Sequence, residues 1–213
     1  MIEVAIIDYR MGNLHSVKAA CEKVGLTAVI TSDHNEILDS KAAILPGVGA
    51  FGEAIAHIKN SNLDNCIYSF IESGRPFIGI CLGLQLLFEK SEEFGNNTGL
   101  KIIKGKIKKF NNYKFNNIKY PVPQVGWNKV EQANIPWENT LLSKVNYDDY
   151  MYFVHSYYIV PENKNIILST TKYGNHNFCS AIQKKNIFAT QYHPEKSGLA
   201  GLKIYEKLKE MIK

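Results

Sequence analysis

The first half of the chain alternates short, wholly apolar runs with segments of helical periodicity, and this order constrains the fold more than any other feature. Strands are predicted at residues 2–8, 27–31, 42–46 and 76–80. Helices are predicted at residues 13–24, from about 51 to 72 with a possible break near 60–62, and at 81–90. Strands that are apolar on both faces and separated by helices indicate a parallel sheet with helices on both sides.

The second half of the chain has a different pattern. Clusters of asparagine, glycine and proline separate β-rich runs at residues 102–110, 126–131, 151–160, 165–172, 178–183 and 187–192. These runs predict an antiparallel portion attached to the parallel sheet. The polar stretch from Asn111 to Asn117 is expected to form a surface hairpin or loop, and Ser197 is expected to cap a last amphipathic helix over 198–213.

The predicted fold class is therefore α/β. It is an open, mostly parallel sheet with helices on both faces, plus an antiparallel portion in the second half of the chain. The length of 213 residues fits a single domain over residues 1–213.

Charge and apolar content narrow the classes of function. The net charge is +5, but lysine supplies nearly all of the positive charge, and Arg10 and Arg75 are the only arginines. The arginine fork that grips phosphates and base edges is scarce, which argues against a nucleic-acid partner. No apolar run approaches the ~20 residues of a membrane span, and the N-terminus lacks the features of a signal peptide. A cytoplasmic location is expected, with neither nucleic acid nor membrane as partner.

The cysteines and histidines do not suggest a metal site. The four cysteines are Cys21, Cys66, Cys81 and Cys179, and no two of them have the spacing of a zinc knuckle or a thioredoxin-like motif. In the cytosol they are expected to be reduced thiols, most of them buried in the core. His155, His176 and Cys179 also lack a credible ligand spacing, so neither a metal nor a cofactor is expected.

The strongest local motif is Gly-Ile-Cys-Leu-Gly at residues 79–83, where an apolar strand meets the start of a helix. A nucleophile at a sharp strand-to-helix turn between close glycines is the arrangement of a nucleophile elbow. The helix start adds partial positive charge and free amide donors, which favour a reactive thiolate. A buried structural cysteine would fit the same motif, so the prediction that Cys81 is a nucleophile depends on finding a base.

A candidate base lies in the run Gln-Tyr-His-Pro-Glu-Lys-Ser at residues 191–197, directly after the last apolar strand. Pro194 biases His193 towards extended backbone geometry, so the imidazole of His193 and the carboxylate of Glu195 can point to the same side. A cysteine, an imidazole that activates it and a carboxylate that orients the imidazole form the triad of acyl transfer. Most of the other five histidines are expected to be structural or exposed.

A glycine-rich turn at residues 46–52 follows one predicted strand and opens a helix. Such a turn can direct backbone amides at an oxyanion that develops during acyl transfer. A phosphate-binding loop is the rival interpretation. The turn lacks the Gly-Lys-Ser/Thr ending of a Walker motif and the spacing of a dinucleotide fingerprint, so the oxyanion role is favoured.

Together these segments resemble the class I (triad) glutamine amidotransferases, whose two signature motifs match residues 79–85 and 193–195. The match narrows to one branch, the glutaminase subunits of imidazole glycerol phosphate synthases, and extends from residue 1 to the C-terminus. The motifs of that branch are Asp-Tyr-Arg-Met-Gly-Asn-Leu at 8–14, Leu-Pro-Gly-Val-Gly-Ala-Phe-Gly at 45–52, Pro-Gln-Val-Gly-Trp-Asn at 123–128, Tyr-Phe-Val-His-Ser-Tyr-Tyr at 152–158 and His-Pro-Glu-Lys-Ser-Gly at 193–198.

The resemblance implies a role for each matching residue. Cys81 would attack the side-chain amide of glutamine, His193 would carry the thiol proton to the departing ammonia, and Glu195 would hold the imidazole. The implied oxyanion donors are the backbone amides of Val48 and Leu82. The residues implied to hold glutamine are Gly49, Gln85, Glu93, Ser156 and Tyr157.

The resemblance also implies a heterodimer. The partner would be a (β/α)8-barrel cyclase that receives the ammonia and makes imidazole glycerol phosphate for histidine biosynthesis, and the glutaminase would be nearly idle without it. The positions that match the family's interface are Asn13, Trp127, Tyr152 and Lys196, although Trp127 and Tyr152 could instead be core aromatics. Arg10 stands where the family usually has glycine. If glycine's positive φ is needed there, the backbone must shift, which leaves the identity of the partner open.

Three other interpretations remain. A related glutaminase could feed a cyclase-like partner in the amidation of surface sugars, and Arg10 is a mild hint in that direction. A module that only binds a partner would have no need of the intact Cys81, His193 and Gln85. A cysteine peptidase of similar fold would not predict Gln85 after the elbow or the run at residues 193–198.

Overall fold

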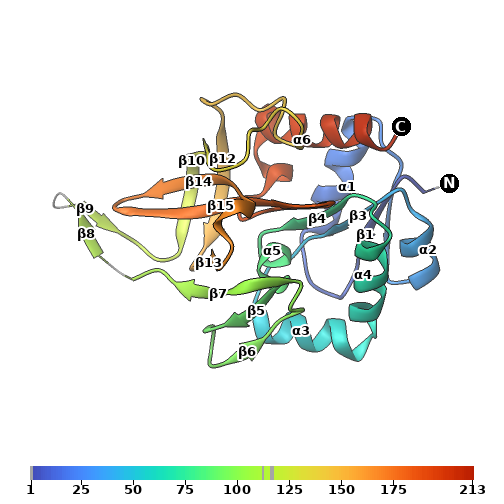
Figure 1. Ribbon diagram of the computed structural model, residues 1–213, viewed down its shortest axis with the longest axis horizontal. Helices are drawn as coiled ribbons and strands as arrows, with labels where there is room; N and C mark the ends of the chain where they lie inside the picture. Colours follow the sequence, from blue (N-terminus) through green and yellow to red (C-terminus); the bar gives the residue numbers. More distant parts are fainter. Residues whose placement is uncertain (1, 112, 116–117) are drawn as a thin grey trace.

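The computed structural model describes residues 2–111, 113–115 and 118–213 (Figure 1). Within these ranges a mixed sheet of 12 strands runs in the order β2-β1-β3-β4-β16-β15-β13-β7-β5-β6, while β14 pairs with β15 and β11 pairs with β14. Helices surround one half of the sheet, and the antiparallel strands extend away to the opposite end of the molecule (Figure 1). The predicted α/β architecture is confirmed.

The parallel half of the sheet consists of the predicted apolar strands. They are β1 (Val4–Ile7), β2 (Ala28–Thr31), β3 (Ala42–Leu45), β4 (Phe77–Ile80) and β16 (Ile187–Thr190). All pairings among these five strands are parallel. Every residue of β1, β3, β4 and β16 is buried, as expected for strands that are covered on both faces.

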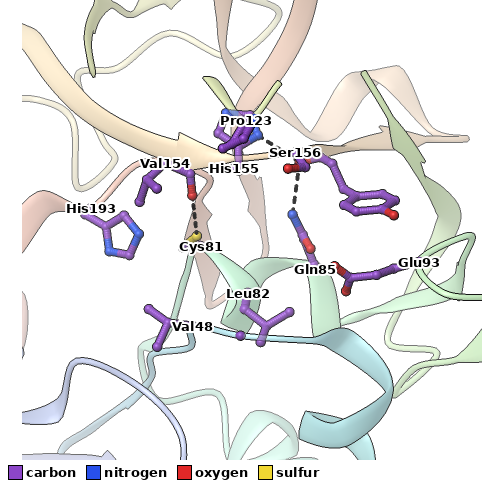
Figure 2. Close-up of a pocket in the computed structure, with 12 residues that line it drawn as sticks. Val48, Cys81, Leu82, Gln85, Glu93, Pro123, Val154, His155, Ser156 and His193 are labelled. Carbon is purple, nitrogen blue, oxygen red and sulfur yellow. Dashed lines mark hydrogen bonds between the residues drawn. The ribbon is translucent and has the colours of Figure 1, made fainter. Parts of the chain in front are cut away.

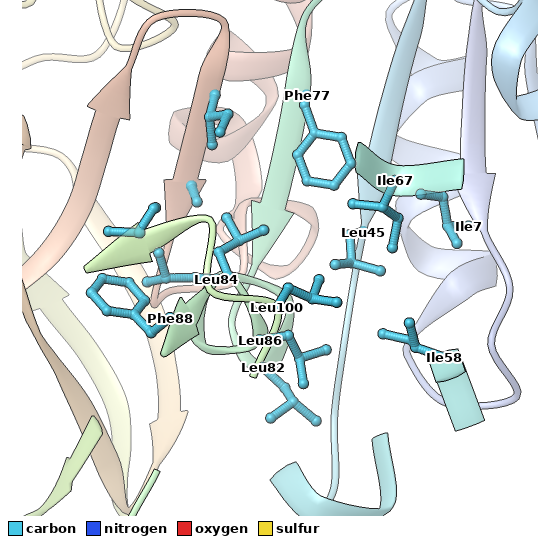
Figure 3. Packing of buried hydrophobic residues seen from close by; sticks show 14 of the residues in the cluster. Ile7, Leu45, Ile58, Ile67, Phe77, Leu82, Leu84, Leu86, Phe88 and Leu100 are labelled. Carbon is cyan, nitrogen blue, oxygen red and sulfur yellow. The ribbon is translucent and has the colours of Figure 1, made fainter. Parts of the chain in front are cut away.

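Alternate residues of β1 face two separate hydrophobic clusters. Ala5 and Ile7 belong to the cluster shown in Figure 3, beneath α3 (Phe51–Asn60) and α4 (Leu63–Glu72). Val4 and Ile6 belong to the cluster on the other face, beneath α1 (Leu14–Lys23) and α6 (Gly198–Met211). Helices therefore cover both faces, as predicted.

The helices of the first half of the chain agree with the prediction at one point and add to it at another. The predicted break near 60–62 is real, because Asn62 has a left-handed φ of 56° and separates α3 from α4. The helix α2 (His34–Asp39) was not predicted. Its N-cap residue Asp33 accepts hydrogen bonds from the amides of Asn35 and Glu36, and Glu36 occupies the N3 position that favours a capped start.

The predicted helix over 81–90 is wrong in its second half. Helix α5 covers only Leu82–Leu86, and Phe88–Ser91 forms strand β5. β5 pairs in parallel with β7 (Ile103–Lys109) and antiparallel with β6 (Asn97–Thr98). The backbone groups of this segment are thus taken up by strands that follow it in the sequence, which the local apolar periodicity does not show.

The antiparallel portion contains β13 (Tyr157–Pro161), β14 (Ile167–Tyr173), β15 (His176–Lys184), β7 and the short β11 (Glu131–Gln132). The predicted run 151–160 is divided at Ser156. Its first part, β12 (Tyr150–His155), pairs with β10 (Gln124–Lys129) in a separate two-stranded sheet. A short 3-10 helix, η1 (Lys164–Ile166), directly precedes β14.

The remaining predictions concern surface segments and the last helix. Strands β8 (Tyr113–Phe115) and β9 (Ile118–Tyr120) pair antiparallel, while residues 112 and 116–117 of the predicted hairpin or loop lie outside the described residues. Ser197 stands at the N-cap of α6, as predicted, but its side chain caps no amide of that helix. Among the described residues, no helix is long and apolar enough to cross a membrane.

Arg10 has the positive φ that the sequence analysis associated with glycine at this position. Its φ is 70°, and its amide donates a 2.8 Å hydrogen bond to Asp8 Oδ1. Arg10 therefore adopts a left-handed conformation without a shift of the backbone, at the modest cost that a Cβ brings there.

Candidate active site

Cys81 lies at a strained turn between β4 and α5. Its φ of 54° and ψ of −107° are unusual for a residue with a side chain. The Cys81 amide donates a 2.7 Å hydrogen bond to the carbonyl of Thr190, which ties the turn to the neighbouring strand β16. This is the geometry of a nucleophile elbow, in which the strained turn exposes the side chain at the carboxyl end of the sheet.

Close packing requires glycine at residue 83 and leaves little room for a side chain at residue 79. A Cβ on Gly83 would lie 1.8 Å from the Leu45 carbonyl oxygen, and one on Gly79 would lie 3.0 Å from the Cβ of Ala189. The turn can approach β3 only because Gly83 has no side chain.

Replacing Gly83 by alanine should therefore destabilise the elbow severely. We expect urea unfolding to show a loss of about 3 kcal/mol or more in the free energy of unfolding, at the upper end of overpacking costs. Gly74→Ala is the matched control, since its Cβ would meet nothing within 4 Å at a φ of 78°. The control should lose only about 1–2 kcal/mol. Equal losses in the two variants would contradict the packing explanation.

A cavity of about 330 Å³ opens above the elbow (Figure 2). It brings together nearly all of the residues that the sequence analysis assigned to catalysis and glutamine binding. Its lining consists of Val48, Gly49, Cys81, Leu82, Gln85, Glu93, Pro123, Val154, His155, Ser156, Tyr157 and His193. Among the described residues, no group of three or more histidine, cysteine, aspartate or glutamate side chains could hold a metal ion.

His193 and Glu195 form a buried pair beside Cys81. The Nδ1 atom of His193 lies 2.8 Å from Glu195 Oε1, and Asn13 Nδ2 donates a 3.3 Å hydrogen bond to the same oxygen. His193 has the extended backbone that Pro194 was expected to favour, with φ −102° and ψ 94°. The Nε2 atom of His193 is buried without a hydrogen-bond partner among the described residues. That nitrogen is thus available to exchange a proton with the cysteine.

The charges around His193 favour its protonated form. Burial alone would lower the pKa of His193, but the sulfur of Cys81 and the carboxylate of Glu195 outweigh it and raise the pKa above its ordinary value. No hydrogen bond of good geometry joins Nε2 to the sulfur, so the interaction is mainly one of charge. An imidazolium beside a thiolate is the state from which a cysteine attacks an amide.

The backbone that carries His193 is anchored to β12. The His193 amide donates to the Tyr152 carbonyl at 2.9 Å. The hydroxyl of Ser197 accepts from the Tyr152 amide at 2.9 Å and donates to the His193 carbonyl at 2.6 Å. This explains why the Ser197 side chain caps no helix amide: it joins the histidine loop to the strand.

The two expected oxyanion donors are in different situations. Val48 lies at the cavity and is 40% exposed, and the adjoining Gly49 has a φ of 102°. The Leu82 amide donates to the Gly47 carbonyl at 3.4 Å. In this conformation a carbonyl therefore occupies the Leu82 donor, and the glycine-rich turn would have to move before that amide could serve an oxyanion.

Gln85 and Glu93 lie together at one side of the cavity (Figure 2). Gln85 Nε2 donates to the Tyr157 carbonyl at 3.1 Å. Glu93 Oε2 accepts from the Phe51 amide at 2.6 Å. Burial raises the pKa of Glu93, although the Phe51 amide and the charge of Lys109 oppose the shift. Carboxylate and amide oxygens at this place suit a cationic amino group.

Two polar residues of the site were given no role in the sequence analysis. His155 is buried, and its Nδ1 lies 2.8 Å from the Tyr157 carbonyl. Burial lowers the pKa of His155 to about 4, so its ring is neutral. Gln191 is also fully buried and lies under Cys81, with its Nε2 3.7 Å from the sulfur. The signal for Gln191 was its position, a polar residue directly after a wholly apolar strand.

The four predicted interface residues do not all lie in one kind of environment. Trp127 is 51% exposed and makes an edge contact with Tyr152, its cross-strand partner, at 5.9 Å between ring centroids. Lys196 is exposed. Trp127 therefore does not belong to the hydrophobic core. Asn13 instead lies at the active site, where its side chain donates a hydrogen bond to the carboxylate of Glu195.

Known proteins resemble this chain along its whole length. The family model for "Glutamine amidotransferase class-I" matches residues 5–207. A protein of Trichodesmium erythraeum named imidazole glycerol phosphate synthase subunit HisH is 46% identical, and the match covers 96% of this chain and 92% of the relative. The HisH subunit of Caldanaerobacter subterraneus is 47% identical, with 99% and 98% covered.

A solved structure shows the same fold at low sequence identity. PurLQS from Thermotoga maritima superposes with a TM-score of 0.73 at 19% identity, and all of both chains is covered. The elbow, the cavity above it and these likenesses lead to one conclusion: the chain belongs to the class I glutamine amidotransferases.

Proposed function

We propose that this protein is the glutaminase subunit of an imidazole glycerol phosphate synthase in histidine biosynthesis. It would hydrolyse glutamine to glutamate and ammonia with Cys81, His193 and Glu195, as one amidotransferase domain over residues 1–213. The observation that carries the proposal is the cavity that joins Cys81, at its strained turn, to the buried His193–Glu195 pair. The HisH names of the relatives support the choice of synthase.

The geometry supports a two-stage reaction. His193 takes the thiol proton of Cys81, and the thiolate attacks the side-chain amide carbon of glutamine. The tetrahedral intermediate collapses when His193 returns the proton to the leaving nitrogen, so that ammonia departs and a glutamyl thioester remains. Water, deprotonated by His193, then attacks the thioester, and glutamate leaves with the restored thiol. Glu195 holds the imidazole in orientation throughout.

The oxyanion of both stages needs the amides of Val48 and Leu82. Because the Leu82 amide is bound to the Gly47 carbonyl at 3.4 Å, the turn at 46–49 must rearrange to free it. The absence of one such donor slows amide hydrolysis by about 10²- to 10³-fold. This agrees with the expectation that the subunit is nearly idle by itself.

We expect glutamine to bind in the cavity in one orientation. Glu93 and the Oε1 atom of Gln85 lie where they would hold the α-ammonium group, while Ser156, Tyr157 and Gly49 line the rest of the cavity. The side-chain amide of glutamine would then point towards Cys81. A volume of about 330 Å³ is at the lower end for ligand sites and suits a single amino acid.

We propose a (β/α)8-barrel cyclase as the partner, in a heterodimer through which the ammonia passes. The half-exposed Trp127, with Tyr152 beside it, offers an aromatic contact of the kind enriched at interfaces. Lys196 is exposed next to Glu195, and Asn13 contacts Glu195. We also propose a cytoplasmic location, where thiols such as Cys81 stay reduced.

A second candidate keeps the glutaminase and changes the partner. Arg10 adds an exposed cation at a left-handed turn where glycine is usual for the branch. A related glutaminase that feeds a cyclase-like partner in surface-sugar amidation would be compatible with that change.

The test is the release of glutamate from glutamine. It should be slow for the protein alone and rise strongly, by about 10²-fold or more if a missing oxyanion donor is the cause, when a histidine-pathway cyclase and its nucleotide ligand are added. Unchanged slow hydrolysis, with Cys81 still alkylated by a diazo ketone that mimics glutamine, would favour the second partner. If neither glutamate release nor alkylation occurred, the glutaminase itself would be refuted.

A further inference from the structure

Gln191 is buried next to the nucleophile, and its role is unassigned. It directly follows β16, whose last residue, Thr190, accepts the amide of Cys81 at 2.7 Å. The amide of Gln191 itself donates to the Ser180 carbonyl at 2.8 Å. The backbone of Gln191 is thus fixed on one side by β15 and lies against the elbow on the other.

The side chain of Gln191 has two polar contacts, both within the site. Its Nε2 lies 3.7 Å from the Cys81 sulfur, and its Oε1 accepts a 3.0 Å hydrogen bond from Gln85 Nε2. The whole residue is 0% exposed. Burying a primary amide is unfavourable unless its groups are paired, so its partners account for its presence here.

The orientation of both amides follows from one backbone carbonyl. The Tyr157 carbonyl can only accept, so Gln85 must present its NH2 group there. The second N–H of that group then requires an acceptor, which is Gln191 Oε1. With its oxygen engaged in this way, Gln191 has only its NH2 group left to face the sulfur. A relay of hydrogen bonds, from the Tyr157 carbonyl through Gln85 to Gln191, thus fixes a donor beside Cys81.

The same relay determines what Gln85 offers the substrate. A primary amide has two N–H groups, and both of those on Gln85 are used, by the Tyr157 carbonyl and by Gln191. Its oxygen therefore remains for the cavity, on the side of Glu93 (Figure 2). The orientation of the Gln191 amide, which faces the Cys81 sulfur, is therefore linked to the orientation of the Gln85 amide, which faces the cavity.

Among the described residues, the other groups around the sulfur supply no equivalent neutral donor. The ionisable groups that face it are His193 after β16 and Tyr9 after β1, with Glu195 behind His193 and His155 across the cavity on β12. The Tyr9 hydroxyl donates to the Pro46 carbonyl at 2.8 Å, and burial raises the pKa of Tyr9, so it stays a neutral phenol turned elsewhere. The Val154 carbonyl, 4.0 Å from the sulfur, is an acceptor.

We propose that Gln191 stabilises the Cys81 thiolate by donating a side-chain N–H to the sulfur, held in this orientation by Gln85 and the Tyr157 carbonyl. A donor aimed at sulfur favours the charged thiolate over the thiol, because hydrogen bonds to ions are stronger than those to neutral groups. The role in catalysis rests on the proposed glutaminase function, but the effect on the thiol does not.

The first test measures the rate at which iodoacetamide alkylates Cys81 as a function of pH, read at the Cys81 peptide by mass spectrometry. Gln191→Glu keeps the shape and the acceptor for Gln85 but replaces the donor by oxygen, and Gln191→Met removes both groups. For each variant we expect half-maximal alkylation at a pH higher by about 1 unit or more, and about tenfold slower alkylation at pH 7. The control is Gln183→Met, whose amide bonds to the Lys185 carbonyl outside the cavity.

A second measurement separates stabilisation of the thiolate from a general structural role. Under partner-stimulated conditions, Gln191→Glu should lower kcat about tenfold with little change in KM, because Gln85 keeps its acceptor. Gln191→Met should lower kcat and also raise KM. Gln85→Glu should shift alkylation in the same direction, because a carboxylate at residue 85 would turn the Gln191 amide over and point its oxygen at the sulfur.

The outcomes are distinguishable. Folded Gln191→Glu protein with the alkylation profile of the unsubstituted protein would overturn the proposal. If the Gln191 variants do not fold, an unchanged profile in Gln85→Glu would overturn it instead. A shifted profile in a protein that never releases glutamate would uphold the donor and refute the glutaminase. Normal glutaminase activity with unshifted alkylation would refute the donor alone.

Discussion

Alanine in place of Cys81 should abolish glutamine hydrolysis, lowering partner-stimulated kcat by roughly 10⁶-fold, the scale on which removal of a triad nucleophile acts. We expect so large a loss because no other described thiol can replace Cys81 as the nucleophile. Burial raises the pKa of Cys66 to about 11 and that of Cys21 to about 12, and it also raises the pKa of Cys179, so all three thiols stay protonated at neutral pH. The measurement is glutamate release with the cyclase and its ligand present.

Binding of the partner is the matching control for Cys81→Ala. The substitution leaves the surface residues Trp127 and Lys196 in place, so the affinity for the cyclase should stay within about twofold, as for a surface left untouched. Cys66→Ala, which alters a thiol in α4, should keep its hydrolysis rate. Residual hydrolysis at a tenth of the original rate in Cys81→Ala would mean that another group is the nucleophile.

Alanine in place of His193 should lower kcat by about 10⁴-fold, the upper range for loss of a general acid–base. It removes the group that we propose to accept the thiol proton and return it to ammonia, and leaves Glu195 buried beside Asn13 without its imidazole. Because the raised pKa of His193 keeps a positive charge beside the sulfur at neutral pH, the variant should also need a higher pH for alkylation of Cys81. Glutamate release measures the loss in kcat, and the rate of Cys81 alkylation as a function of pH measures the second effect.

A double variant tests whether the two residues act as a unit. Since every step proposed for His193 requires the attack by Cys81 or the thioester that it forms, Cys81→Ala/His193→Ala should hydrolyse glutamine no more slowly than Cys81→Ala alone. His57→Ala, at a surface histidine near Glu53, should retain full activity. Additive losses in the double variant would show that His193 acts on the reaction by a route that does not include the cysteine.

Local sequence signals were sufficient for the parts of the fold that depend on local chemistry. The apolar strands of the parallel half and the turn at residues 79–83 were predicted, because a strand covered on both faces and a glycine-flanked elbow are each written in adjacent residues. The broken helix near Asn62 was likewise marked by a cluster of polar turn residues. α2 escaped because six residues with one buried side chain, Ile37, carry too little periodicity, although Asp33 and Glu36 marked its start.

The remainder depends on contacts between segments far apart in the chain. The helix predicted to reach residue 90 ends early because Phe88–Ser91 pairs with β7, which the segment's own residues do not reveal. The motifs were enough to propose the triad residues, but the contact of Asn13 with Glu195 spans 182 residues. The position of Gln191 beside Cys81 spans 110 residues. Only the folded sheet brings these pairs together.

Tyr152 has two roles that the fold keeps apart. Its amide and carbonyl are bound to Ser197 and His193, whereas its ring lies against Trp127 on the outer side of β12. The backbone contacts are independent of side-chain identity, so the ring can be exchanged without displacing the histidine loop. Selection can therefore redesign the outer aromatic surface to suit a new synthase while the chemistry is inherited unchanged.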